Sequence, residues 1–184
     1  MGLSDNYHVK RLSLKNKIAR LLWYFVSSTF FRLSPIPLHG WRRFILRLFG
    51  ASVGSGAHPY PSANIWAPWN LIMEENSCLS HGVNCYNVAT VSLGKNVTVS
   101  QFCHLCTATH DYTDLQMPLL VASIRIDDYA WVTADVFVGP GVVIGEGAVV
   151  NARSCVFSDI DPWTVARGYP AKSYRKRILK GVKD

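Results

Sequence analysis

Residues 126–161 read IDDYAW VTADVF VGPGVV IGEGAV VNARSC VFSDID, which is six blocks of six residues. An aliphatic residue opens every block: Ile126, Val132, Val138, Ile144, Val150 and Val156. The fifth position is mostly small or β-branched, in Ala130, Val136, Val142, Ala148, Ser154 and Ile160. Neither the 3.6-residue period of a helix nor the alternation of a strand gives this pattern. It is typical of a parallel β-helix, in which each block forms one flat side and a turn.

The same phase continues upstream. LGKNVT, VSQFCH and LCTATH keep it through Leu93, Val99 and Leu105, whereas residues 111–125 do not fit and are expected to leave the coil as a loop. Three blocks close one triangular turn, so residues 53–161 should hold about five turns and extend on the order of 24 Å. A β-sandwich would instead show irregular spacing and hairpin signals such as Asn-Gly, and neither is present.

The two ends of the chain have other patterns. Residues 1–52 contain IARLLWYFVSSTFFRL at 18–33 and LHGWRRFILRLFG at 38–50, separated by Ser-Pro-Ile-Pro, which predicts two helices. They either cap the open end of the prism or lie in a membrane interface, and the first is too short to span a bilayer. Residues 162–184 form a basic tail, with a short helix expected over 171–182.

The net charge of +7 is concentrated at these ends. The basic residues are Lys10, Arg11, Lys15, Lys17, Arg20, Arg42, Arg43 and Arg47, then Lys172, Arg175, Lys176, Arg177, Lys180 and Lys183. Anionic lipid headgroups or the phosphates of a nucleotide-containing cofactor are the favoured partners, because no nucleic-acid module is recognisable. Five cysteines, an odd number, and no secretory segment fit reduced thiols in a cytoplasm.

The stretch CHLCTATHDYTD, residues 103–114, has two interpretations. Cys103, Cys106 and His110 could begin a zinc site, but no second ligand pair follows at a structural spacing, and Cys103 takes a position that should be small and buried. In the other interpretation His110, the sixth residue of its block and the last before the loop, is a general base. The phase of the six-residue blocks favours His110 as a general base over the zinc site.

Several segments together resemble the left-handed β-helix O-acetyltransferases that acetylate sugars from acetyl-CoA. They are the hexapeptide ladder, the Thr-His-Asp before the loop, WVTADVFVGPGVVIGEGAVVNARSCV, ARGYPAK and, near the start, WRRFILRLFGASVG. The match is closest to proteins named for colanic acid biosynthesis. The resemblance implies a fold with an all-β core, a left-handed parallel β-helix of about five turns, with N-terminal helices and a short C-terminal helix.

The resemblance also implies site residues. His110 would take the proton from an acceptor sugar hydroxyl, which attacks the acetyl-CoA thioester directly, and Asn84 would help to orient that hydroxyl. Asp111 stands where relatives often have proline, and would shape the loop or contact the acceptor. No metal is expected.

Family members are trimers with the cofactor groove between prisms, so a homotrimer is expected here. Ala134 and Ala152 would let the pantetheine approach the backbone, beside Trp131. Lys172 and Arg175 would face the nucleotide phosphates. Phe157 and Ser158 replace the Thr-Lys of several relatives, so a lysine contact to the nucleotide is missing.

The predicted function is O-acetylation of a saccharide, lipid-linked or nucleotide-linked, in exopolysaccharide or surface-glycan synthesis. The enzyme would be cytoplasmic, with peripheral contact at the inner membrane. Two alternatives stay open. One is a trimeric zinc enzyme like the γ-carbonic anhydrases, for which His81, His104 and His110 are available; the other is a non-catalytic scaffold.

Overall fold

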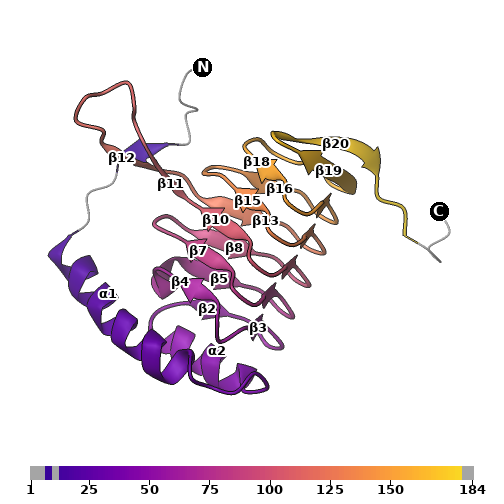
Figure 1. Cartoon of the computed structure of the whole chain (residues 1–184). Coiled ribbons are helices and arrows are strands. Elements are labelled where there is room, and N and C mark those ends of the chain that lie inside the picture. Colours follow the sequence, from indigo (N-terminus) through magenta and orange to yellow (C-terminus); the bar gives the residue numbers. More distant parts are fainter. Residues whose placement is uncertain (1–6, 10–12, 180–184) are drawn as a thin grey trace.

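The computed structural model describes residues 7–9 and 13–179, and it is a triangular prism of stacked turns with two helices at one end (Figure 1). Lys10, Arg11, Lys180 and Lys183 lie outside the described residues. Each of the three walls is a parallel sheet, and the walls hold five complete turns. The pairing of Ile160 with Ile144 begins a sixth turn.

The strands follow the hexapeptide phase around the prism. Wall 1 contains β2 (Ser52–Val53), β5 (Leu71–Met73), β8 (Val91–Leu93), β13 (Ile124–Ile126) and β16 (Val143–Ile144). Wall 2 contains β3 (His58–Pro59), β6 (Cys78–Leu79), β9 (Thr98–Val99), β14 (Trp131–Val132), β17 (Val149–Val150) and β19 (Thr164–Gly168). Wall 3 contains β4 (Asn64–Ile65), β7 (Asn84–Tyr86), β10 (His104–Cys106), β15 (Phe137–Val138) and β18 (Cys155–Val156). A 3₁₀ turn, Pro68–Asn70, joins β4 to β5.

The aliphatic residue that opens each block points into the prism. Val132, Val138 and Ile144 are fully buried, and so are their counterparts in the turns above and below. Parallel pairing places identical positions of successive turns over one another, as in the pairing of Leu105 with Cys85 and Val138. The core is therefore a set of stacked side-chain ladders and contains no channel.

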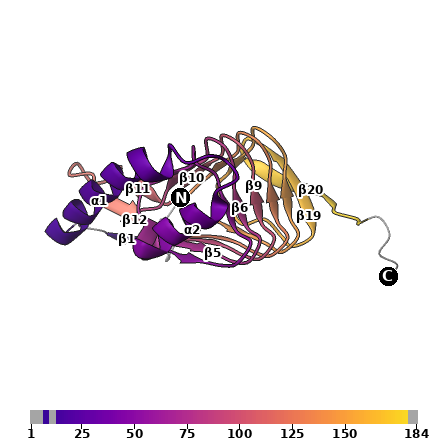
Figure 2. The same cartoon turned by 90° about the horizontal axis from the view of Figure 1, so that it is seen from below.

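The N-terminal helices close the first turn. They are α1 (Leu14–Val26), a π-helical continuation (Ser27–Phe31) and α2 (His39–Leu48), and Figure 2 shows them beside the early strands. Trp23 and Leu46 are buried in one cluster with Val53 of the first turn. The indole Nε1 of Trp23 donates to the Ile65 carbonyl at 2.6 Å. Within the described residues, no helix is long and apolar enough to cross a membrane.

Arg42 joins the interhelical segment to the prism. Its side chain is fully buried and donates to the carbonyls of Pro59 at 2.7 Å and Pro35 at 2.8 Å. Burial lowers the pKa of this guanidinium. A charge buried among carbonyl acceptors is stable only while all its donors are paired, so Arg42 has a structural role here and is not free to bind an external anion.

The helix predicted over 171–182 is wrong. Within the described part, Ala171–Lys176 forms strand β20, which pairs antiparallel with β19, while residues 180–182 lie outside the description. The last strand of wall 2 would otherwise present an unpaired edge, and β20 supplies its hydrogen bonds. This long-range pairing outweighs the weak helical pattern of the basic residues.

The boundaries of the excursion also differ from those predicted. The chain leaves the prism after β10, and β11 (Ala108–His110) pairs antiparallel with β12 (Leu119–Val121) to form a projecting hairpin. It is back in wall 1 at Ile124. β1 (His8–Val9) adds a third strand to this hairpin. His110 therefore lies on the hairpin and not at a prism corner.

Candidate active site

Thr107 anchors the hairpin that carries His110. This residue is fully buried, its hydroxyl donates to the Tyr86 carbonyl at 3.0 Å, and it accepts from the Ala89 amide at 3.0 Å. Its own carbonyl accepts from the Ala122 amide on the returning strand. Both strands of the hairpin are thus fixed at their base to wall 3.

The imidazole of His110 is exposed, and its orientation is set by one hydrogen bond. Nδ1 lies 2.6 Å from the carbonyl oxygen of Met117. Because a carbonyl oxygen only accepts, Nδ1 carries the hydrogen, and in the neutral ring Nε2 is then left with a free lone pair. The hairpin therefore holds the tautomer that a general base needs, with its basic nitrogen pointing away from the Met117 carbonyl.

Asp111 shapes the tip of the hairpin. Its Oδ1 accepts from the Thr113 hydroxyl at 2.6 Å and from the Thr113 amide at 3.0 Å. The hydrogen bond from the Thr113 hydroxyl, and to a smaller extent the one from the Thr113 amide, hold the pKa of the Asp111 carboxyl below its usual value. A second turn at Asp114 follows, where Oδ1 accepts from the Gln116 amide. In this chain the Asp111 carboxylate does not contact the His110 ring through any hydrogen bond of the described residues.

Asn84 lies on wall 3 in a polar ladder. It pairs with Asn64 one turn below and with His104 one turn above, and its Oδ1 accepts from Asn64 Nδ2 at 3.2 Å. His104 is half-buried, and burial lowers the pKa of its imidazole. Asn84 and His110 thus lie on different elements, wall and hairpin, and share no hydrogen bond within the described part of one chain.

The three histidines of the zinc alternative are separated in the same way. His81 lies at the edge between walls 2 and 3, where Nδ1 is 2.7 Å from the Ser62 hydroxyl, while His104 is on wall 3 and His110 on the hairpin. Among residues 7–9 and 13–179 no group of three or more His, Cys, Asp or Glu side chains is placed to hold a metal.

Two cysteine thiols are buried in the core. Burial raises the pKa of the Cys103 thiol to about 11 and that of Cys85 to about 12, so both are protonated at neutral pH.

The positions expected to contact the cofactor follow one edge of the prism. Ala134 and Ala152 occupy equivalent turns between walls 2 and 3, and the amide of Arg153 donates to the Ala134 carbonyl at 3.0 Å. Trp131, on wall 2, is partly exposed and donates from Nε1 to the Ser100 hydroxyl at 2.9 Å. Ala152 is exposed and Ala134 is partly exposed.

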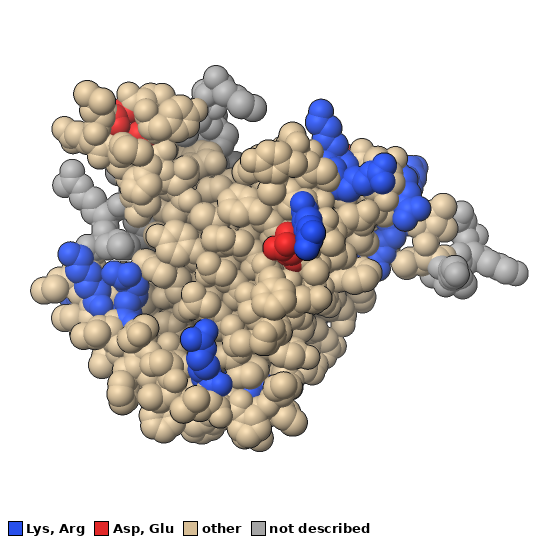
Figure 3. Space-filling model, in the orientation of Figure 1, with Lys and Arg blue, Asp and Glu red and all other residues tan. Residues whose placement is uncertain are grey.

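Lys172 and Arg175 are exposed on β20 above wall 2, where Lys172 pairs with Arg167 and Arg175 pairs with Val165. The Arg175 guanidinium lies 5.5 Å from the Tyr174 ring, and the Arg167 guanidinium lies 4.3 Å from it. Tyr174 also contacts Asn151, the neighbour of Ala152, through a 3.4 Å hydrogen bond. Figure 3 shows several Lys and Arg side chains gathered at this end of the molecule. Sequence reasoning missed Arg167, although its position in ARGYPAK offered the signal.

Comparison with known proteins identifies the family. WcaF of Escherichia coli K12, whose name assigns it to colanic acid biosynthesis as an acetyltransferase, is 39% identical over 163 residues, 89% of this chain and 90% of its own length. This chain belongs to the hexapeptide-repeat acetyltransferases. It is thus an acetyltransferase by family, as the sequence predicted. No family model matches the chain.

Solved structures of acetyltransferases share the fold. A hexapeptide-repeat acetyltransferase of Vibrio cholerae in complex with acetyl-CoA has a TM-score of 0.83 at 21% identity and covers 94% of both chains. A galactoside acetyltransferase in complex with CoA has a TM-score of 0.75 at 22% identity and covers 92% of this chain and 86% of its own. The predicted left-handed parallel β-helix is confirmed.

Proposed function

We propose that this acetyltransferase transfers the acetyl group of acetyl-CoA to a hydroxyl of a saccharide, with His110 as the general base. The observation that carries the proposal is the 2.6 Å contact from Nδ1 to the Met117 carbonyl, which leaves Nε2 basic. The acceptor proton passes to Nε2 while the acceptor oxygen attacks the thioester carbonyl. The carbon–sulfur bond then breaks, and the departing sulfur takes the proton back from the imidazolium.

The acceptor and the donor are assigned to different parts of the molecule. Asn84 on wall 3 would orient the acceptor hydroxyl, and Asp111 would contribute by fixing the hairpin tip. The donor would follow the edge formed by Trp131, Ala134 and Ala152, with its phosphates near Lys172 and Arg175. The relationship to WcaF supports a role in exopolysaccharide or surface-glycan synthesis.

A homotrimer is part of the proposal. Wall 3 and the turn between β19 and β20 expose a row of aromatic rings, in which Phe137 lies 5.7 Å from Phe157 and Phe157 lies 6.1 Å from Tyr169. Phe157 is 54% and Tyr169 78% exposed in the single chain. Contiguous apolar surface of this kind is typical of subunit interfaces. A neighbouring prism packed there would also bring a second chain toward the ladder that contains Asn84 and His104.

The proposal includes peripheral contact with the cytoplasmic face of an anionic membrane. Helix α1 exposes one apolar stripe, opposite the buried Trp23, that consists of Leu14, Ile18, Leu21, Leu22 and Phe25. The spacing i, i+4, i+7, i+8 and i+11 is that of a single helix face. No Asp or Glu occurs between residues 6 and 73, so every Lys and Arg charge of this segment is without an acidic partner from the same segment. A bilayer with anionic headgroups fits both properties.

Titration calorimetry with acetyl-CoA, followed by the slow background hydrolysis of the thioester, tests the chemistry. Wild-type protein and His110→Ala should both bind acetyl-CoA, and hydrolysis should fall in the variant. Absence of binding to the wild type would contradict the proposal, as would equal hydrolysis by both proteins.

Vesicle co-sedimentation tests the membrane contact. Vesicles containing phosphatidylglycerol should bind the wild type, whereas the double variant Leu21→Glu/Phe25→Glu should not bind. Leu115→Glu, at a fully exposed leucine of the hairpin tip, is the matched control and should bind normally. If the double variant alters only the oligomeric mass, the stripe is an interface between copies of this chain.

A further inference from the structure

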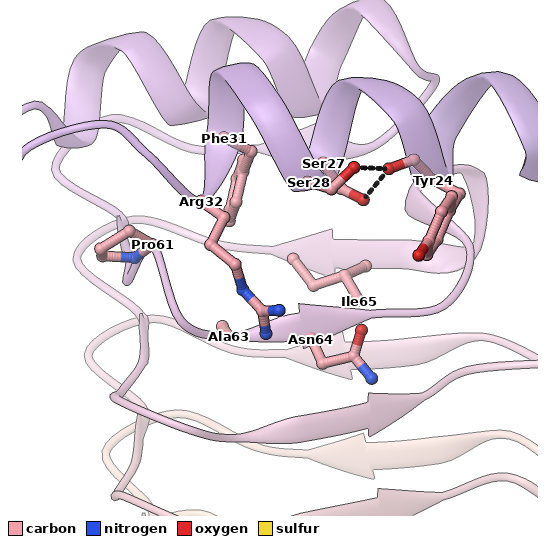
Figure 4. Close-up of a pocket in the computed structure, with 9 residues that line it drawn as sticks. All are labelled: Tyr24, Ser27, Ser28, Phe31, Arg32, Pro61, Ala63, Asn64 and Ile65. Carbon is pink, nitrogen blue, oxygen red and sulfur yellow. Dashed lines mark hydrogen bonds between the residues drawn. The ribbon is translucent and has the colours of Figure 1, made fainter.

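A groove lies between helix α1 and the first turn of wall 3. It comprises two adjoining hollows, of about 100 and 220 Å³, which share Tyr24, Ser27, Asn64 and Ile65. Figure 4 shows the first hollow, with the π-helical segment above and β4 below. The groove reaches the polar ladder of the candidate active site, because Asn64 Nδ2 donates to Asn84 Oδ1.

One end of the groove has the chemistry of a saccharide subsite. The guanidinium of Arg20 lies over the Trp66 ring at 4.5 Å, and Trp66 meets Tyr86 edge-on at 5.7 Å. Arg20 Nε is buried without a hydrogen-bond partner. Flat apolar faces beside a few convergent amide and hydroxyl groups are typical of pockets for small polar ligands.

The other end carries a cation without a counterion. Arg32 is exposed and extends from the helix toward Ala63 and Asn64, as Figure 4 shows. Its guanidinium makes no ion pair among the described residues, whose salt bridges are Lys95–Glu75, Arg125–Asp127 and Arg153–Asp135. The absence of Asp and Glu between residues 6 and 73 leaves no acidic side chain near it in the sequence. A guanidinium in this state favours a bidentate phosphate.

We propose that the groove binds a saccharide that carries a phosphate ester, and that Arg32 is the residue that selects the phosphate. The sugar would lie beside Asn84 and the Arg20–Trp66 pair, and the phosphate would lie at Arg32. The assignment of the sugar end rests on the proposed function, which places the acceptor hydroxyl at Asn84. A nucleotide sugar and a lipid-linked sugar diphosphate share this chemistry.

Titration calorimetry with glucose 1-phosphate and with methyl glucoside tests the proposal. The phosphorylated sugar should bind the wild type at least tenfold more tightly than the neutral glycoside, and Arg32→Gln should abolish that preference. Arg125→Gln, on wall 1, is the matched control and should behave as wild type. Arg32 makes no side-chain hydrogen bond among the described residues, so its variant should fold normally, which thermal unfolding verifies.

Competition identifies the source of the phosphate. Displacement of glucose 1-phosphate by UDP indicates a nucleotide sugar, and displacement by farnesyl diphosphate indicates a lipid carrier. No preference for the phosphorylated sugar in the wild type, or an equal preference in Arg32→Gln, overturns the proposal. Acetyl-CoA binding and thioester hydrolysis by the wild type are measured alongside: their absence marks a failure of the acetyltransferase mechanism, whereas the absence of the sugar-phosphate preference alone marks a failure of this proposal.

Discussion

Replacing Trp23 should measure how strongly the helices stabilise the first turn of the prism. The indole is 3% exposed, lies 5.1 Å from the Phe49 ring and 5.8 Å from the Phe31 ring, and donates to the Ile65 carbonyl. Truncation of a buried tryptophan to alanine costs about 3–5 kcal/mol. Trp23→Phe keeps most of the ring but leaves the carbonyl unpaired, which costs about 1–3 kcal/mol.

Urea unfolding followed by far-UV circular dichroism gives the free energies of unfolding of Trp23→Ala and Trp23→Phe. Phe25→Ala, on the exposed side of the same helix, is the control and should change the free energy by no more than about 0.5 kcal/mol. Each turn of a solenoid contacts only its neighbours, so amide exchange in Trp23→Ala should accelerate in β2 to β4 before β16 to β18. A loss below about 1 kcal/mol for Trp23→Ala, with unchanged exchange in β4, would refute the reasoning.

Three further predictions concern chemistry and charge. His110→Ala should reduce acetyl transfer by about 10²–10⁴-fold without weakening acetyl-CoA binding, while Leu115→Ala should leave the rate unchanged in a thiol-release assay. The double variant Lys172→Gln/Arg175→Gln should weaken acetyl-CoA binding by about 1 kcal/mol, a factor of about five, and high salt should remove the difference; a salt-independent loss would place these residues elsewhere. Burial lowers the pKa of the His104 and His39 imidazoles, so folding favours their neutral form. The resulting contribution to the free energy of unfolding is complete above the unfolded-state pKa of about 6.5, and it is lost as the pH falls through the folded-state pKa values. His104→Phe should flatten this acid dependence in thermal unfolding, and an unchanged profile would contradict it.

The sequence by itself determined the architecture because the repeat is local and redundant. Aliphatic residues recur every six positions, and equivalent side chains of successive turns stack on one another in the core. The six-residue period is therefore sufficient to predict the fold. The same phase made His110 the sixth residue of its block and the last before the excursion. It also made Cys103 a buried core residue and argued against a zinc site through its thiol.

Only the tertiary structure decided the features that depend on partners distant in sequence. The hairpin begins at Ala108 because the Thr107 hydroxyl is hydrogen-bonded to the Tyr86 carbonyl at its base. Residues 171–176 form the strand β20 because they pair with the otherwise open edge of β19. The tautomer of His110 depends on the Met117 carbonyl, and the groove at Arg32 exists because α1 lies over β4. Such contacts join segments with no shared period, so their geometry is set by packing after the repeat has formed and cannot be read from spacing along the chain.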